Sequence, residues 1–222
     1  MKHIYNSKDS SYYKHVREDL ITLLPKNPFQ KVFEIGSGGG NTIIEIKSRG
    51  LASEVVGCDL FELINSQQKN PLIDKFIIAN LETENISLNV EYFDVIIAGD
   101  VLEHLTDPWE VVNKLTPFLK SGGHFIISVP NIRQFSIMYK IFFKGDFDYN
   151  PEGGVLDKTH LRFFCKKNVQ GLLNKQEYNI ISVRPPFDII YRRGIKRFFN
   201  RLTFKFFEEF MTSQYVIIAQ KN

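Results

Sequence analysis

The sequence predicts an α/β fold in which helices cover both faces of a mostly parallel sheet. Short apolar runs alternate along the chain with helix-length amphipathic segments, which is the pattern of successive strand–helix–strand units. One apolar run leads into a glycine-rich loop at 36–40. Another, at 93–98, is apolar almost throughout, as expected for a strand buried on both faces.

The elements follow in order. A first amphipathic helix is expected at 10–24, where Pro25 ends it, as part of an N-terminal helical cap over 1–28. Strands are expected at 31–35, 54–58, 75–79, 93–98 and 124–129, with helices between them at 41–48, at 61–68 and from 107 to before Gly122. After residue 130 we expect helices at 133–143 and 167–175, then strands at 178–183 and 215–219 that form an antiparallel pair at the edge.

The helix that begins near residue 107 carries the clearest local signals. Asp107 suits the N-cap, Pro108 the first helical position and Glu110 the capping-box position. Its expected buried stripe consists of Trp109, Val112, Leu115 and Leu119.

Composition indicates one globular domain over residues 1–222, since 43% of the residues are hydrophobic, 24% are charged, and no repeat or linker interrupts the chain. Cys58 and Cys165 lie far apart in sequence, with no CxxC or Cys/His spacing. This pattern predicts neither a disulfide framework nor a metal site. An aromatic, irregular insert at 131–165 follows the fifth strand.

The basic residues are concentrated in a second insert, at 189–211. Six cations and no acid lie between 189 and 207. The rest of the chain has 22 basic and 25 acidic residues, so it has no broad basic surface and no nucleic-acid partner is expected. Three interpretations stay open for this phenylalanine-rich segment: a helix packed on the domain, a lid or homodimer element beside the acceptor site, or a helix on an anionic membrane surface.

The N-terminal residues lack the apolar core of a secretory signal, and no apolar run approaches the roughly 20 residues of a membrane span. We therefore expect a cytoplasmic protein, peripheral at the inner face of the membrane if the basic insert binds lipid.

The glycine-rich loop predicts a ligand site at the carboxyl end of the first strand. Gly36, Gly38 and Gly40 allow a sharp turn and a close approach of a ligand to the backbone. Asn41 stands where a dinucleotide-binding loop has its third glycine, and Glu34 places an acid where a pyrophosphate would bind, so an oxidoreductase of the Rossmann type is disfavoured. Asp59 ends the second strand and can accept hydrogen bonds from ribose hydroxyls.

The glycine-rich loop is part of one of three motifs that occur together. They are Glu34-Ile-Gly-Ser-Gly-Gly-Gly40, Gly57-Cys-Asp59 and Phe93-Asp-Val-Ile-Ile-Ala-Gly-Asp-Val-Leu-Glu-His-Leu105. Together they resemble the class I methyltransferases that use S-adenosylmethionine. Within that family the chain is similar to a bacterial branch with "FDVI…DVLEHL.DP", "L..GG.…ISVPN" and "HLRFF" segments, found here at 93–108, 119–131 and 160–164.

The resemblance implies a Rossmann-like three-layer sandwich with strand order 3-2-1-4-5-7-6 and an antiparallel strand 7. It also implies S-adenosylmethionine as cofactor, with S-adenosylhomocysteine as product. Glu34, Gly36, Ser37 and Gly38 would face its methionine end, and Asp59 and Leu60 its ribose. Asn80 and Leu81 would lie beside adenine, and Gly99, Asp100 and Val101 near the cofactor. The family often has Asp in place of Asn80, whose amide oxygen can still accept a hydrogen bond.

Methyl transfer to a hydroxyl benefits from a base, and His160 is the first candidate, with Asp157 to orient it. His104 or Glu103 is the next choice, and Arg162 could pair with an acidic acceptor. In the alternative interpretation, His160 and Arg162 only tie their loop to the sheet and His104 is a surface histidine. We expect O-methylation of a small or saccharide hydroxyl, on a lipid-linked acceptor if the membrane interpretation holds. N-methylation and non-catalytic cofactor binding at a membrane are the alternatives.

Overall fold

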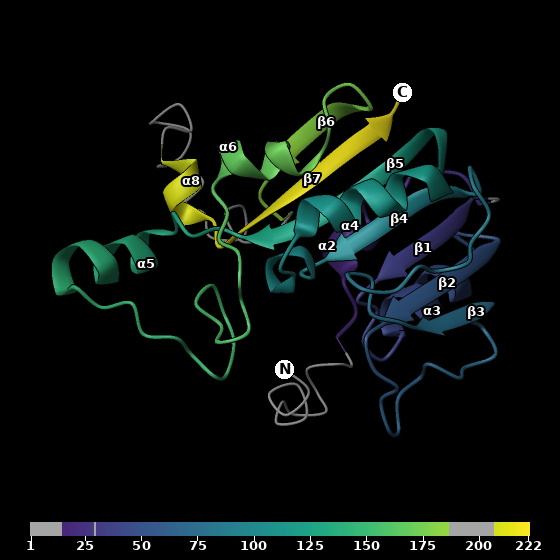
Figure 1. Ribbon diagram of the computed structural model, residues 1–222, viewed down its shortest axis with the longest axis horizontal. Coiled ribbons are helices and arrows are strands. Elements are labelled where there is room, and N and C mark those ends of the chain that lie inside the picture. The colour runs from purple at the N-terminus through teal and green to yellow at the C-terminus, as the bar shows by residue number, and fades with distance from the viewer. Residues whose placement is uncertain (1–14, 29, 187–206) are drawn as a thin grey trace.

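The computed structural model describes residues 15–28, 30–186 and 207–222. Its centre is a seven-stranded sheet of order β3-β2-β1-β4-β5-β7-β6 (Figure 1). The strands are β1 (Lys31–Ile35), β2 (Glu54–Asp59), β3 (Lys75–Ile78), β4 (Phe93–Gly99), β5 (Leu119–Pro130), β6 (Tyr178–Arg184) and β7 (Gln214–Lys221). β1 to β5 pair in parallel, while β7 runs antiparallel to both β5 and β6. The predicted strand order and the antiparallel strand 7 are confirmed.

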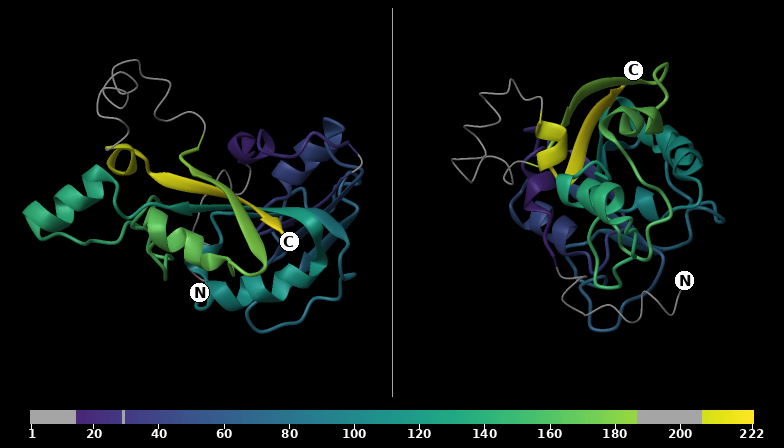
Figure 2. Two further views of the ribbon diagram at one scale, coloured as in Figure 1. Left: turned by 90° about the horizontal axis from the view of Figure 1, so that it is seen from above. Right: turned by 90° about the vertical axis from the view of Figure 1, so that its left-hand side faces the viewer.

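Alternate residues of each central strand face two separate apolar cores. On β1, Val32 faces the core made with α2 (Glu18–Ile21) and α3 (Asn41–Ser48). Phe33 and Ile35 face the other core, made with α4 (Pro108–Leu115) and α6 (Lys166–Val169). The side view shows these helix pairs on opposite faces of the sheet, which is the expected three-layer sandwich (Figure 2).

Local signals located α3 and α4 well. α3 has the predicted bounds, and the Asp107 side chain accepts a hydrogen bond from the Glu110 amide at 3.0 Å, with Pro108 as first helical residue. The helix is shorter than expected, because a 3₁₀ turn (Thr116–Phe118) follows it and β5 begins at Leu119. Trp109 was wrongly assigned to the buried stripe: 43% of it is exposed.

The helix predicted at 61–68 is wrong, because the segment forms turns. Asn65 has a φ of 58°, which a right-handed helix does not contain. The buried Gln68 side chain donates to the carbonyls of Gly38 and Phe61 and accepts from the Leu63 amide. These side-chain bonds replace the helical backbone bonds and fix the segment against the glycine-rich loop.

The N-terminal helix is shorter than expected, since α2 covers only Glu18–Ile21 and residues 1–14 of the predicted cap lie outside the described residues. The predicted helix at 133–143 is α5 (Phe135–Tyr139) followed by a π-helical turn (Lys140–Lys144), and a 3₁₀ turn (Gln170–Leu172) follows α6. Of the basic insert, the structure describes 207–211, including α8 (Glu208–Met211); its cations lie outside the described residues.

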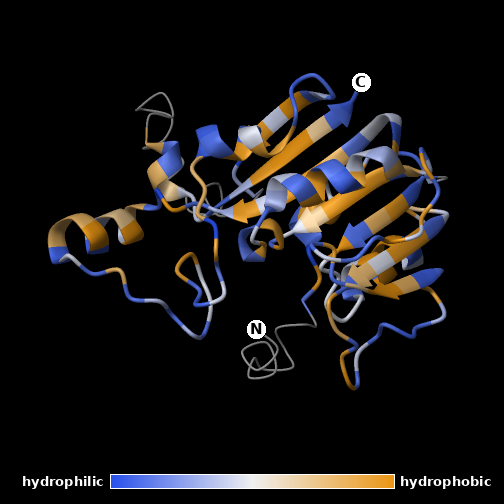
Figure 3. Ribbon diagram, in the orientation of Figure 1, coloured by the Kyte–Doolittle hydropathy of each residue, from blue (hydrophilic) through white to orange (hydrophobic). Residues whose placement is uncertain are grey.

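α5 projects from the carboxyl end of β5, away from the sheet, and carries apolar bands (Figures 1 and 3). Within the described residues, no helix is both long enough and apolar enough to cross a membrane.

Candidate cofactor and acceptor site

The turn after β1 requires glycine at its first position. Gly36 has a φ of 62°, and a Cβ added there would lie 2.1 Å from Cγ2 of Val101. The loop therefore packs directly against the turn that follows β4. This contact joins the glycine-rich loop to the segment that contains Asp100, Glu103 and His104, as the parallel pairing of β1 with β4 requires.

Glu34 is buried beneath this loop, with 4% of its surface exposed. Its Oε2 atom has no hydrogen-bond partner in the part of the chain that the structure describes. Burial raises the pKa of Glu34 to about 8. The Ser37 hydroxyl donates to the Glu34 carbonyl at 2.8 Å, which fixes the loop over it. A buried carboxyl group with an unused oxygen suits a ligand that carries a positive charge.

Asp59 connects the end of β2 to the glycine-rich loop. Its Oδ2 atom accepts a hydrogen bond from the Gly38 amide at 2.7 Å, and burial raises its pKa. Leu60 is partly buried beside it. After β3, the Asn80 amide oxygen accepts from the Glu82 amide at 3.0 Å, and Leu81 packs against the core. These residues all follow strands at the same edge of the sheet, where the sequence predicted the cofactor.

Asp100, after β4, is the centre of a polar network that the sequence did not reveal in full. Its carboxylate accepts hydrogen bonds from Arg17 at 2.7 Å, from the Ser128 hydroxyl at 2.8 Å and from the Gln214 amide at 2.5 and 2.6 Å. Asp100 has a φ of 56°. Gly99 leaves room for Arg17, whose Nη1 would lie 3.3 Å from a Cβ there. The network ties the N-terminal segment, β5 and β7 to this edge.

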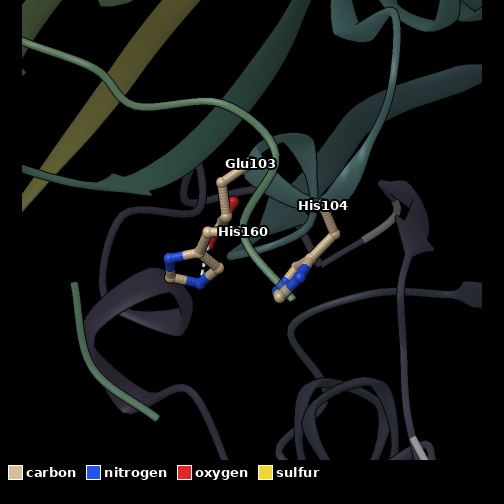
Figure 4. Close-up of side chains that lie close together, drawn as sticks. All are labelled: Glu103, His104 and His160. Carbon is tan, nitrogen blue, oxygen red and sulfur yellow. Dashed lines mark ion pairs between the residues drawn. The ribbon is translucent and has the colours of Figure 1, made fainter. Parts of the chain in front are cut away.

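Glu103, His104 and His160 form a cluster beside that network (Figure 4). One ligand-type atom from each lies within 4.8 Å of the others. The Nε2 atom of His160 is 3.9 Å from Oε1 of Glu103, and the two imidazole rings are 4.8 Å apart in an edge-to-face arrangement. The 160 loop is held there because the Glu103 carbonyl accepts from the Leu161 and Arg162 amides at 2.8 and 3.0 Å.

Both histidines turn Nδ1 toward a backbone carbonyl. His160 Nδ1 lies 2.9 Å from the Val155 oxygen, and His104 Nδ1 lies 3.2 Å from the Thr159 oxygen. A carbonyl only accepts hydrogen bonds, so each Nδ1 carries the proton and the lone pair of a neutral ring is on Nε2.

The structure places a second acid, Glu103, beside the Nε2 atom of His160, in addition to the predicted Asp157. Asp157 is buried and its Oδ1 accepts from the Thr159 amide and hydroxyl at 2.8 and 2.7 Å, which shapes the loop that carries His160. Glu103 supplies the carboxylate beside Nε2. Burial raises the pKa of Glu103 well above its usual range. Arg162 donates to the Thr106 carbonyl and so fixes the same loop to the turn after β4.

A family described as "Methyltransferase domain" matches residues 5–183, most of the chain. The chain belongs to that family. The sheet order and the glycine-rich loop agree with the fold of the class I methyltransferases.

Individual relatives are more distant. The mitochondrial ubiquinone biosynthesis O-methyltransferase of Rattus norvegicus is 30% identical over 172 residues, which are 72% of this chain and 47% of that protein. The chain thus spans about half the length of this curated relative.

Two solved structures show the same fold. A SAM-dependent methyltransferase from Archaeoglobus fulgidus has a TM-score of 0.63 at 18% identity, over 96% of this chain and 100% of that one. Another from Methanosarcina mazei has a TM-score of 0.64 at 18% identity, over 93% and 99%.

The residues at this edge of the sheet fit S-adenosylmethionine. The unused oxygen of buried Glu34 suits its ammonium group. Gly36 and Gly38 have positive φ angles that shape the loop over Glu34, and the acid at the end of β2 suits ribose hydroxyls. When bound, S-adenosylmethionine supplies an electrophilic methyl group on a sulfonium. Transfer of that group would require the protein to hold the acceptor in line with the sulfur–methyl bond.

Proposed function

We propose that this methyltransferase acts on a hydroxyl of a small molecule. The observation that carries the proposal is the cluster at Glu103, His104 and His160, which lies beside the expected cofactor site and contains groups that handle a proton near neutral pH. The relative named as a ubiquinone biosynthesis O-methyltransferase supports oxygen as the acceptor atom.

The transfer has a simple balance. The acceptor oxygen passes its proton to the Nε2 atom of His160 and forms a bond to the methyl carbon, while the bond from that carbon to sulfur breaks and its electron pair stays on sulfur. An amine acceptor starts with a more nucleophilic atom and depends less on help with the proton. O-methylation and N-methylation therefore differ in how strongly they depend on His160.

The test uses matched pairs of acceptors, each a hydroxyl compound and its amino analogue, from saccharide and quinol classes. Methyl transfer from labelled cofactor is measured in wild type and in His160→Ala. We expect turnover of hydroxyl acceptors, with kcat lowered by on the order of 10²–10⁴ in the variant and with S-adenosylhomocysteine affinity unchanged. Turnover of amines alone, equally fast in both proteins, would contradict the proposal and favour N-methylation.

The same proposal includes acceptors attached to a lipid, because α5 and the π-turn after it present an apolar surface. Phe135, Phe142 and Phe143 are 64%, 78% and 75% exposed, next to the exposed Lys140 and Lys144. Basic, apolar helical segments bind anionic membrane surfaces. Sedimentation with vesicles of anionic and of neutral lipid tests this contact. We expect binding to the anionic vesicles, and a marked loss of it in a Phe142→Ser, Phe143→Ser double variant; equal binding of both proteins would refute the role of this turn.

A further inference from the structure

The side chain of Gln68 is buried in the turn segment that follows β2, and it bonds to the glycine-rich loop. We propose that Gln68 is a positioning residue for the cofactor. It holds the turn segment 61–68 against that loop, and so sets the orientation in which the Asp59 carboxylate meets the ribose hydroxyls. This inference rests on the assignment of the ribose to Asp59, and it is independent of the acceptor atom in the proposed function.

The first argument is that the Gln68 amide is fully used. Only 5% of the residue is exposed. Its Nε2 atom donates to the Gly38 carbonyl at 2.8 Å and to the Phe61 carbonyl at 3.0 Å, and its Oε1 atom accepts from the Leu63 amide at 2.9 Å. A side-chain amide has two N–H groups to donate, and both have partners here. A side chain of similar size without an amide would therefore leave three backbone groups without this partner.

The second argument is that the Gly38 peptide is held from two sides. Its N–H donates to Oδ2 of Asp59 at 2.7 Å, while its carbonyl accepts from Gln68. The neighbouring Gly39 carbonyl accepts from the Gln67 backbone amide at 3.0 Å. Gly38 has a φ of 53°, and a glycine backbone adopts many conformations with little steric restriction. Hydrogen bonds from outside the loop therefore select the conformation in which its N–H points to Asp59.

Gln68 also acts on Asp59 through the turn segment itself. The Phe61 amide donates to Oδ1 of Asp59 at 3.4 Å, and the carbonyl of the same residue accepts from Gln68. Both carboxylate oxygens of Asp59 are thus directed by backbone groups that Gln68 holds. A carboxylate offers about four acceptor positions, so capacity remains for a ribose hydroxyl.

The segment depends on this side chain because it lacks a helix. Residues 61–68 form turns, and Asn65 has a φ of 58°. A helix would fix its own shape through backbone bonds between successive turns. Here the contact between Gln68 and Gly38, 30 positions apart, supplies that restraint. Because hydrogen bonds to a carboxylate are strong and directional, a small rotation of Asp59 would weaken those to the ribose.

The experiment is a calorimetric titration of the 222-residue chain with S-adenosylhomocysteine and with its analogue that lacks both ribose hydroxyls. Gln68→Met keeps a side chain of similar length and removes the amide. In wild type we expect S-adenosylhomocysteine to bind at least about 10-fold more tightly than the analogue, because hydrogen bonds to charged groups are strong. In Gln68→Met we expect this ratio of affinities to fall to about 3-fold or less. The control is Gln67→Met, which changes the exposed neighbouring glutamine and should keep the wild-type ratio.

The ratio separates positioning of the ribose from general loss of structure. A merely structural role would weaken both ligands equally, so an equal ratio in wild type and Gln68→Met would overturn the positioning role. A wild type that binds both ligands equally well would refute the assignment of the ribose to Asp59, and the inference with it. Neither result changes the O-methylation proposal, which is tested by its acceptors.

Hydrogen exchange in wild type gives a second test that does not depend on the folding of a variant. The Leu63 amide donates to Gln68 Oε1, so its exchange rate, measured by NMR, reports whether Gln68 holds the turn segment. At saturation we expect S-adenosylhomocysteine to slow this exchange more than the analogue without ribose hydroxyls does. An equal effect of the two ligands, or no effect of either, would overturn the inference.

Discussion

Replacement of Gly36 by alanine tests the contact between the glycine-rich loop and the turn after β4. The new Cβ would lie 2.1 Å from Val101 Cγ2, far inside van der Waals contact, at a φ of 62°. The left-handed backbone costs an L-residue roughly 1–2 kcal/mol, and forced overpacking costs roughly 1–3 kcal/mol more. We therefore expect Gly36→Ala to lower the free energy of unfolding by about 2–5 kcal/mol and to weaken S-adenosylhomocysteine binding.

The Val101→Ala change separates the two causes. It removes the methyl groups that the new Cβ meets, so the double variant should regain the steric part of the loss and keep the backbone part. Urea unfolding gives the free energies, and calorimetry gives the affinities. If Val101→Ala restores nothing to Gly36→Ala, or if Gly36→Ala is as stable as wild type, the loop does not pack on Val101 as described.

Three further predictions follow from the caps and carboxyl groups. Asp107→Ala removes the cap of α4 and should cost about 1 kcal/mol, seen as a Tm lower by roughly 2–4 °C, with cofactor affinity unchanged; an unchanged Tm would contradict the cap. Because Glu34 has a pKa of about 8 in the folded protein against 4.5 normally, ionisation favours the unfolded chain. The stabilisation by the protonated Glu34 side chain is complete below pH 4.5 and is lost as pH rises through 8. The free energy of unfolding of Glu34→Gln should therefore depend less on pH than that of wild type; parallel curves would refute this. Binding of the cofactor ammonium near neutral Glu34 should release a proton at pH 7, seen as a binding heat that depends on the buffer in wild type but not in Glu34→Gln.

The sequence predicted the sheet and the elements with strong local signals. Asp107-Pro108 fixed the start of α4, and the apolar runs located the central strands. The segment at 61–68 was mispredicted because the buried Gln68 bonds to Gly38, 30 residues earlier, and this contact has no local signal. Trp109 fits an apolar stripe by spacing, but its exposure depends on which neighbours cover the first turn of α4.

The site was predicted only in part, again because contacts between residues far apart in the sequence have no local signal. The glycine-rich loop, Glu34 and Asp59 are consecutive signals at strand ends, and the structure brings them to one edge of the sheet. The cluster of Glu103 with His160 joins residues more than 50 positions apart, and its geometry depends on the backbone bonds between Glu103 and the 160 loop. The partners of Asp100 on β5 and β7 depend on strand order, so sequence spacing alone did not reveal Ser128 or Gln214.

The most direct test of the central claim is a calorimetric titration of the protein with S-adenosylhomocysteine, S-adenosylmethionine and NAD⁺. Wild type, Asp59→Ala and the control Asp107→Ala are compared. We predict binding of both adenosyl ligands and not of NAD⁺, with affinity lost in Asp59→Ala and kept in Asp107→Ala. Binding of NAD⁺ in place of the adenosyl ligands, or adenosyl binding that Asp59→Ala leaves unchanged, would contradict the assignment of this edge of the sheet as the cofactor site.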